Sequence, residues 1–219
     1  MLMSLGISGH YQTTFAQYRG RGRHMFINAP NDYGSFYTED VNPRHYDRFM
    51  SRVEGYKNSH SKTREFSIDL HYPRSVKPED INGNADISRW RHNYERSLNR
   101  RGLDPDVAWT REESKTGRPH YHVHVLVDGQ RVRYPYGLYK DAKASWEKVL
   151  DTQQDGLAHY CNKDKHGTPH PNGLEIRRNE ETPDFIKRKA MYYSKLRSKG
   201  EVGDGNRNYY VSSKHIIKE

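Results

Sequence analysis

The segment from His120 to Val127 constrains the fold more than any other part of the chain. It reads His-Tyr-His-Val-His-Val-Leu-Val, with a histidine at every second position and apolar residues between. Such alternation is typical of a β-strand, in which successive side chains point to opposite faces of the sheet. We therefore expect a strand with one histidine face and one apolar face that packs into a core.

A second strand is expected immediately before it, over residues 107–113. The Lys-Thr-Gly-Arg sequence at 115–118 has turn composition, and two strands this close together form an antiparallel hairpin. A turn centred on the Thr-Gly pair places Glu113 opposite His120, whereas a shorter or bulged turn places Glu112 there. One of these two carboxylates would then join the histidine face.

The remaining periodic segments predict an α+β fold. Helices are expected over residues 43–55, 87–101, 138–150 and 183–199, with Asp86 as the N-cap of the second, and strands over 65–72, within 156–177 and over 209–212. The strand at 65–72 would be half-buried. This order predicts an antiparallel central sheet flanked by helices. Residues 41–219 would form a single domain, and residues 1–40 a loosely ordered basic arm.

The charge balance indicates a polyanionic partner. Lys and Arg number 37 against 28 Asp and Glu, which gives a net charge of +9 and a pI near 9.5. A folded basic domain of this size is typical of nucleic-acid binding. Only 32% of residues are hydrophobic and 30% are charged, a balance that favours disorder, but 12% are aromatic. Disordered chains are poor in aromatics, so we expect a folded domain.

Several classes of protein are excluded by what the sequence lacks. The single cysteine, Cys161, rules out an internal disulfide and any cysteine-based zinc module. No run of 18 apolar residues is present, and the first residues do not have the pattern of a signal peptide. No phosphate-binding glycine loop is present either. We expect a cytoplasmic protein without a small-molecule cofactor.

The histidine face predicts a metal site. His120, His122 and His124 share this face, and Glu112 or Glu113 would approach from the neighbouring strand. Two imidazoles and a carboxylate with open positions suit a catalytic divalent ion such as Mn²⁺ or Mg²⁺. The pattern leaves both His120 with His122 and His122 with His124 open as the ligand pair. A zinc site without chemistry is a further alternative.

The last expected helix carries two stripes at helical spacing. The apolar stripe is formed by Ile186, Ala190 and Tyr193, and the basic stripe by Arg188, Tyr192, Lys195 and Lys199. A tyrosine among cations is placed to meet a phosphate, because the cations favour its ionised form and bind the phosphodiester. Tyrosine is also a competent covalent nucleophile.

Together these motifs resemble those of the HUH endonucleases, named for a His-hydrophobic-His pair, and in particular the inovirus-type replication initiators of filamentous phages. The matching segments are Arg111-Glu112, His120-Tyr121-His122, the Tyr-x-x-Lys segment from Tyr192 to Lys195, and Gly203-Asp204-Gly205-Asn206-Arg207. The resemblance covers about residues 42 to 213. His124 departs from it, because the family has an apolar residue there. The resemblance implies the RRM/ferredoxin-like fold of these enzymes.

The resemblance also implies a role for each matching residue. His120 and His122 would be the metal ligands, with Glu112 as the third and Glu113 as its alternative. Tyr192 would be the nucleophile, with Tyr193 as the alternative, and Lys195 would neutralise the phosphate or orient the tyrosine. Separately, the strand at 65–72 places Asp69 where it could orient a metal-bound imidazole.

The function implied is that of a rolling-circle replication initiator. Such an enzyme nicks and rejoins single-stranded or hairpin origin DNA through a 5′-phosphotyrosine intermediate, with a host helicase and polymerase as partners. A transposase-like nickase of a mobile element is an alternative within the same chemistry. A non-catalytic DNA-binding regulator of the same fold, and a nuclease that uses water, are alternatives of other classes.

Overall fold

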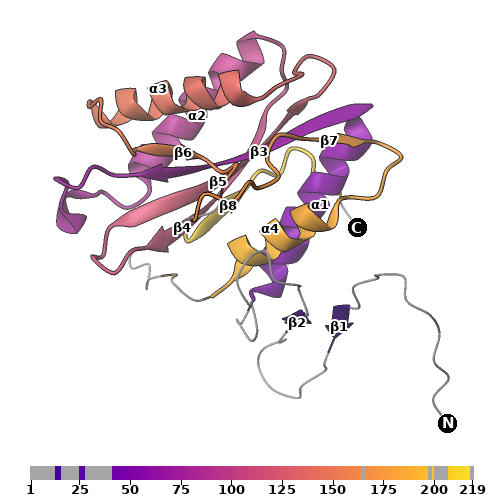
Figure 1. The fold of residues 1–219 in the computed structure, drawn as a ribbon, viewed down its shortest axis with the longest axis horizontal. Coiled ribbons are helices and arrows are strands. Elements are labelled where there is room, and N and C mark those ends of the chain that lie inside the picture. Colours follow the sequence, from indigo (N-terminus) through magenta and orange to yellow (C-terminus); the bar gives the residue numbers. More distant parts are fainter. Residues whose placement is uncertain are drawn as a thin grey trace.

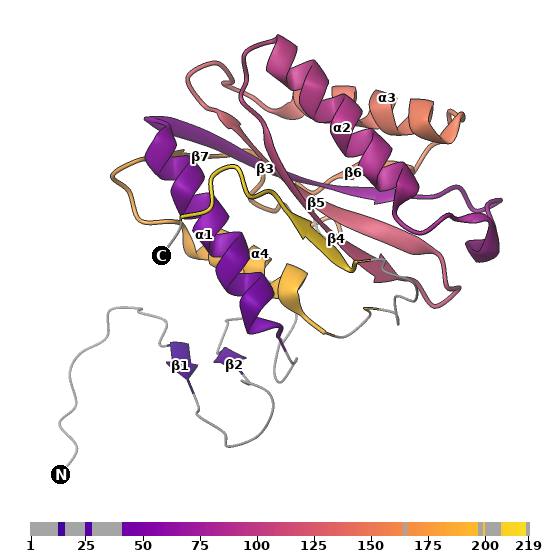
Figure 2. The ribbon, with the colours of Figure 1, turned by 180° about the vertical axis from the view of Figure 1, so that it is seen from behind.

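The computed structural model describes residues 13–15, 25–27, 41–163, 166–196, 199 and 207–217. A six-stranded antiparallel sheet forms the centre, as expected for the α+β class, and helices cover both of its faces (Figures 1 and 2). Within the expected arm, β1 (Thr13–Phe15) pairs with β2 (Met25–Ile27). The other residues of that arm lie outside the described ranges, so its loose order stays a prediction.

The strands of the central sheet follow the order β6-β3-β5-β4-β8, and β7 also pairs with β3. Their bounds are Lys62–His71 for β3, Asp106–Glu113 for β4, Pro119–Asp128 for β5, Ala158–Tyr160 for β6, Leu174–Arg177 for β7 and Tyr209–Val211 for β8. The predicted hairpin is β4–β5. The histidine strand β5 therefore lies between β3 and β4, in the middle of the sheet.

Two helices cover each face of the sheet, as Figures 1 and 2 show. α2 (Ala85–Arg100) and α3 (Tyr136–Leu150) lie on one face, and α1 (Pro43–Ser59) and α4 (Asp184–Ser194) on the other. A short 3₁₀ helix (Pro78–Asp80) precedes α2. Within the described ranges, no helix has both the length and the apolar character needed to cross a membrane.

The face below α2 and α3 is the apolar core that the alternation predicts. Phe66, Ile68 and Leu70 of β3 are fully buried there, against residues such as Trp90 of α2 and Trp146 of α3. The apolar positions of β5 join the same core: Tyr121, Val123, Val125 and Val127. Because these side chains alternate with the histidines, their burial fixes the histidines on the opposite face.

The opposite face of β3 is buried as well, which corrects the expectation of a half-buried strand. α1 and α4 cover it with a smaller apolar cluster that includes Phe49, Val53 and Ile186. Glu65 and Ser67 of β3 are fully buried on this side. Period-two alternation reports which side chains share a face, but it cannot report what covers that face.

Two expected helix boundaries also differ. α1 runs through Gly55 to Ser59 instead of ending at the glycine. Glycine at this position lets the C-terminal segment pack closely on α1, since a Cβ atom there would overlap the carbonyl oxygen of His215. At the start of α2, Asn84 occupies the N-cap position and Asp86 lies in the first turn, where a carboxylate favours the helix dipole.

Candidate metal centre

The register of the β4–β5 hairpin decides which glutamate faces the histidines. Glu112 lies opposite His120, and Glu113 lies opposite Pro119. The loop between the strands contains five residues and is centred on Thr116, with Gly117 at a φ of 77°, so the pairing register differs by one residue from that of a turn centred on Thr116–Gly117. Directly opposed residues of antiparallel strands share a face, so Glu112 points to the histidine side and Glu113 away from it.

Glu112, His120 and His122 form a compact group whose potential ligand atoms all lie within 4.8 Å of one another. Oε2 of Glu112 lies 3.5 Å from Nε2 of His122 and 3.9 Å from Nε2 of His120. Glu112 and His122 are buried, and His120 is half-buried at the rim. The structure thus brings together three of the five candidate ligands.

The donor set and the orientation of its atoms fit a divalent ion. Nδ1 of His122 lies 2.7 Å from Oδ1 of Asp69, which directs Nε2 toward Glu112. That Nε2 atom is buried, and its neighbour in the group is Oε2 of Glu112 at 3.5 Å. A carboxylate on the far nitrogen of a metal-binding histidine is the usual arrangement in metal sites. Two imidazoles and a carboxylate are ligands that suit a first-row transition metal.

The electrostatics of the group favour positive charge on His122. Burial alone would lower the pKa of His122, but Asp69 and Glu112, by charge and hydrogen bonding, raise it to about 9. His120 behaves oppositely, because burial and the neighbouring His122 and His71 lower its pKa to about 4. Its ring stacks on that of His71, with centroids 5.4 Å apart and planes 7° apart. The sequence places His71 on the same strand face as Asp69, and the structure pairs it with His120.

Two lysines contact Glu112 from the end of α4. Nζ of Lys199 lies 3.0 Å from Oε1, and Nζ of Lys195 lies 3.2 Å from Oε2. Burial would raise the pKa of Glu112, but a hydrogen bond with His122 and the charges of Lys199 and Lys195 hold it well below its usual range. The candidate centre therefore carries two cations beside its carboxylate.

These contacts depend on an early end of α4, which corrects the expected helix to Lys199. The helix ends at Ser194, whose carbonyl oxygen accepts a hydrogen bond from the backbone N–H of Asn42 at 2.8 Å. Lys195 leaves the helix in extended conformation and forms a β-bridge with Val41. The basic stripe is consequently not one helical face, and both lysines contact Glu112 from positions beyond the end of α4.

The two adjacent tyrosines of α4 have different surroundings. Tyr192 is half-buried, and its ring lies 5.2 Å from the ring of His122, with Nζ of Lys195 3.7 Å from its centroid. Tyr193 is only 5% exposed and donates a hydrogen bond to Oγ of Ser67 at 3.1 Å. Burial raises the pKa of Tyr193 well above its usual value. Tyr192 therefore lies at the rim of the candidate centre, and Tyr193 in the packing below it.

His124 belongs to a second polar group. Its Nδ1 lies 2.9 Å from Nη1 of Arg52, and its Nε2 lies 3.1 Å from Oε1 of Glu65. A guanidinium can only donate, so Nδ1 of His124 accepts and the ring is neutral with its proton on Nε2. Burial is the main cause that lowers the pKa of His124 to about 4. The structure does not bring His124 into the group of Glu112, and Glu113 instead lies 3.3 Å from Arg111.

Several members of this second group were missed in the sequence. Arg52 and Asp106 form an ion pair at 2.5 Å with neither side chain exposed, and Lys189 contacts Glu65 at 2.7 Å. Glu65 could have been found, because it shares the alternating face of β3 with Ser67 and Asp69. The partners from α1 and α4 give no such signal, since they come from helices distant in sequence.

Three comparisons with known proteins bear on this chain. The sequence model of the YagK/YfjJ C-terminal domain matches residues 29–212. No curated protein is significantly similar in sequence. Among solved structures, the catalytic domain of the Rep protein of adeno-associated virus type 5 shares 14% identity, over 53% of this chain and 75% of that chain, with a TM-score of 0.33.

A second solved structure is the N-terminal nuclease domain of non-structural protein 1 of minute virus of mice. It shares 10% identity over 60% of this chain and 78% of that chain, with a TM-score of 0.32. That domain coordinates Zn²⁺ in its active-site pocket and recognises DNA at the origin of replication. Both TM-scores lie below 0.5, so the chemistry of the site rests on the residues of this chain.

Proposed function

The chain belongs to the YagK/YfjJ C-terminal domain family, and we propose that it is a metal-dependent endonuclease that cleaves single-stranded DNA with a tyrosine nucleophile. One observation carries the proposal. The half-buried ring of Tyr192 lies beside the group of Glu112, His120 and His122, and Nζ of Lys195 lies 3.7 Å from the centroid of that ring. A cation site, a nucleophilic hydroxyl and a positive charge are what tyrosine-mediated cleavage of a phosphodiester requires.

Glu112, His120 and His122 would hold the divalent cation, which we propose is Mn²⁺ or Mg²⁺. When bound, such an ion polarises a phosphate oxygen and stabilises negative charge on the leaving oxygen. Asp69 positions the imidazole of His122 through the 2.7 Å contact with Nδ1. Glu113 and His124 have no part in this assignment, because they point away from the group or into the network with Arg52.

Tyr192 would act in a single displacement at phosphorus. Its hydroxyl gives up a proton, its oxygen attacks in line, and the bond between phosphorus and the 3′ oxygen breaks. The 3′ oxygen takes up a proton and leaves as a 3′-hydroxyl, and the 5′ phosphate remains on Tyr192 as a phosphotyrosine. Attack by a 3′-hydroxyl reverses the step and rejoins the strand without ATP. Lys195 supplies positive charge next to the reacting phosphate.

The finer proposal concerns the biological substrate. By the resemblance of Arg111-Glu112, His120-Tyr121-His122 and Tyr192-to-Lys195 to the inovirus-type initiators, the substrate is single-stranded or hairpin DNA at a rolling-circle origin. The net charge of +9 supports binding to such a polyanion. A host polymerase would extend the free 3′-hydroxyl, and a host helicase would separate the strands.

A covalent-adduct assay tests the proposal. The protein is incubated with single-stranded DNA and Mn²⁺, denatured, and separated on a gel that resolves protein–DNA adducts. Wild type is compared with Tyr192→Phe, His120→Ala and the matched control Tyr193→Phe. We expect an adduct that Tyr192→Phe and His120→Ala abolish and that Tyr193→Phe retains, with the linked peptide containing Tyr192 in mass spectrometry.

Each other outcome of the adduct assay would contradict a different part of the proposed mechanism. Loss of the adduct in Tyr193→Phe alone would transfer the nucleophilic role to the buried tyrosine. Cleavage without a protein–DNA adduct, retained in Tyr192→Phe and in Tyr193→Phe, would indicate a nuclease that uses water. Binding of a demonstrated origin without cleavage, with metal present, would overturn the enzymatic proposal in favour of a regulator.

A further inference from the structure

Four tyrosines gather at the start of α3, on the face of the sheet opposite the candidate metal centre. Tyr134 is 73% exposed and Tyr136 is 52% exposed, the highest values among large apolar side chains of the described residues. The Tyr136 ring lies 5.5 Å from that of Tyr139 and 5.6 Å from that of Tyr160, between centroids. We refer to Tyr134, Tyr136, Tyr139 and Tyr160 as the tyrosine platform.

The inner rings of the platform are fixed by the fold. Tyr139 donates a hydrogen bond to the carbonyl oxygen of Ala158 at 3.1 Å, which ties α3 to β6. Tyr160 belongs to β6 and pairs with Ile68 of β3. Gly173 packs closely on this assembly, since a Cβ atom there would lie 2.8 Å from Pro135 and 3.0 Å from the hydroxyl of Tyr160. The Tyr136 ring therefore rests on a rigid base, which lowers the entropic cost of binding a planar ligand.

Cations flank the exposed rings. The guanidinium of Arg133 lies 5.2 Å from the centroid of Tyr134, and Nζ of Lys140 lies 5.2 Å from that of Tyr136. In the described part of the chain, neither cation has a carboxylate within ion-pair distance. Exposed aromatic rings interleaved with unneutralised cations are the combination that binds single-stranded nucleic acid.

We propose that the tyrosine platform binds unpaired nucleobases of single-stranded DNA. Tyr134 and Tyr136 would stack on successive bases, and Arg133 and Lys140 would bind the adjacent phosphates. Duplex DNA would not bind to the exposed rings, because its bases are already stacked on one another. The identity of the bound strand as the cleaved strand rests on the proposed function.

The edge strand β6 connects the platform with the candidate metal centre. His159 of β6 pairs with Asp69, and the next residue, Tyr160, pairs with Ile68, so their side chains point to opposite faces. Only β3 lies between β6 and β5, which places β6 about 10 Å from the histidine strand at two strand spacings. A single strand passing over the β6 edge would reach both sites.

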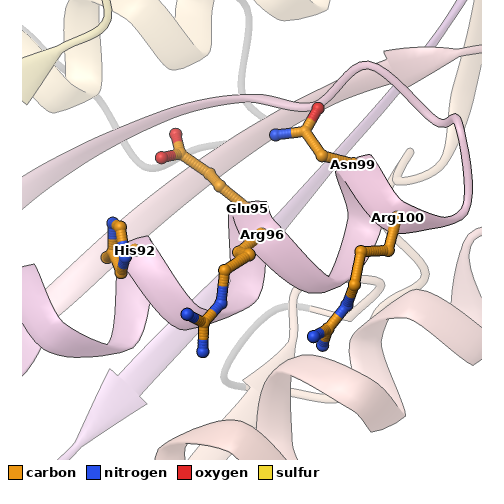
Figure 3. A pocket seen from close by; sticks show the side chains of 5 residues that line it. All are labelled: His92, Glu95, Arg96, Asn99 and Arg100. Carbon is orange, nitrogen blue, oxygen red and sulfur yellow. The ribbon is translucent and has the colours of Figure 1, made fainter.

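A basic surface on α2 provides a control for the tyrosine platform, because it carries positive charge but no exposed aromatic rings. A hollow of about 490 Å³ there is lined by His92, Glu95, Arg96, Asn99 and Arg100. In Figure 3, Arg96 and Arg100 extend together from one side of the helix, with Glu95 and Asn99 on the other. Removing these two arginines lowers charge on the same face of the sheet but removes no stacking ring.

The experiment measures DNA binding by fluorescence anisotropy without divalent ions, so that cleavage cannot intervene. The full chain is titrated into a labelled oligothymidine and into a duplex of equal length, across a range of salt concentrations. Tyr134→Ala/Tyr136→Ala should weaken binding to the single strand by about tenfold for each ring removed. Its affinity for the duplex and its salt slope should not change, because no charge is lost.

Two further variants sharpen the result. Tyr134→Phe/Tyr136→Phe keeps both rings and should stay within about twofold of wild type in single-strand affinity. Arg96→Ala/Arg100→Ala should keep the wild-type preference for single strand over duplex. All variants should retain the wild-type melting temperature, since the substituted side chains are exposed. Unaltered single-strand affinity in the alanine variant, or an equal loss for single strand and duplex, would overturn the platform.

The outcome is independent of the adduct assay. Wild type that forms an adduct, with an alanine variant that binds single strand normally, would refute the platform and leave the proposed function intact. A selective loss of single-strand binding, from a wild-type protein that forms no adduct, would support the platform and refute the enzyme.

Discussion

The two faces of the central sheet are both covered by helices but are chemically opposite. On the side of α2 and α3, β3 and β5 contribute Phe66, Ile68 and Val123 to an apolar core. On the side of α1 and α4, the same strands contribute Glu65 and His124, both fully buried. Helices cover both faces (Figure 1), so the difference does not arise from access to water.

The two faces therefore contribute differently: the apolar face stabilises the fold, and the polar face positions the side chains around His122. Apolar burial contributes roughly 25 cal/mol per Å², without directional requirements. Buried charges lose hydration, and their mutual attraction compensates this only when each is paired with good geometry. The pairs Arg52–Asp106 and Lys189–Glu65 meet that condition at 2.5 and 2.7 Å. We infer that the polar face supports the arrangement around His122 more than it stabilises the domain.

The largest effect is expected when one partner of the buried ion pair is removed. Asp106→Ala leaves the guanidinium of Arg52 buried and without its carboxylate, and should lower the free energy of unfolding by about 3–5 kcal/mol. The matched control is Asp141→Ala, which breaks an exposed pair with Arg101 and should cost less than about 1 kcal/mol. Urea unfolding followed by circular dichroism measures both, and equal losses would contradict the contrast.

A cavity on the apolar face should have the next largest effect. Leu70→Ala removes a fully buried side chain from the core and should cost about 2–5 kcal/mol. Metal binding should persist under conditions where the variant is folded, because Leu70 points away from the candidate centre. The control Leu196→Ala, at a side chain 50% exposed, should stay within about 0.5 kcal/mol of wild type. A Leu70→Ala variant as stable as wild type would show that this face does not dominate stability.

Substitution of the neighbouring residue on β3, Asp69, should impair metal binding rather than stability. Asp69→Asn keeps the size of the side chain but removes the charge next to Nδ1 of His122, and should weaken Mn²⁺ binding by about 10–100-fold. Isothermal titration calorimetry measures the affinity, with Glu113→Gln as a control that should match wild type. Unchanged affinity in Asp69→Asn would remove the positioning role of this carboxylate.

Per pH unit, the smallest effect is a pH dependence of stability from buried histidines on the polar face. Burial is the main cause that lowers the pKa of His45 to about 3 and that of His124 to about 4. The unfolded chain binds protons below about pH 6.5 that these folded histidines do not, so stability should fall as the pH drops from 6.5 to about 4. Each histidine contributes at most about 1.4 kcal/mol per pH unit.

The measurement is a series of urea unfolding curves between pH 4 and 7. His45→Phe keeps an aromatic ring against Tyr209, whose ring centroid lies 4.0 Å from that of His45, and should flatten the pH dependence. A slope in His45→Phe as steep as that of wild type would exclude His45 as one of the titrating groups.

Much of the candidate site could be read from the sequence because it depends on local periodicity. Alternation in β5 placed three histidines on one face, and helical spacing in α4 placed Tyr193 in the packing and Tyr192 outside it. Neither pattern contains the hairpin register. A five-residue loop centred on Thr116 put Glu112 opposite His120, and a one-residue shift of the register would have presented Glu113.

The sequence by itself therefore determined the α+β class, the β4–β5 hairpin and the side chains that share each face, because these follow from periods of 2 and 3.6 residues along the chain. The tertiary structure decided which of the histidines meet Glu112, where α4 ends and how deeply the polar face is buried. Those outcomes depend on contacts between distant segments, such as Arg52 with His124 and Val41 with Lys195. Local periodicity contains no information about such partners.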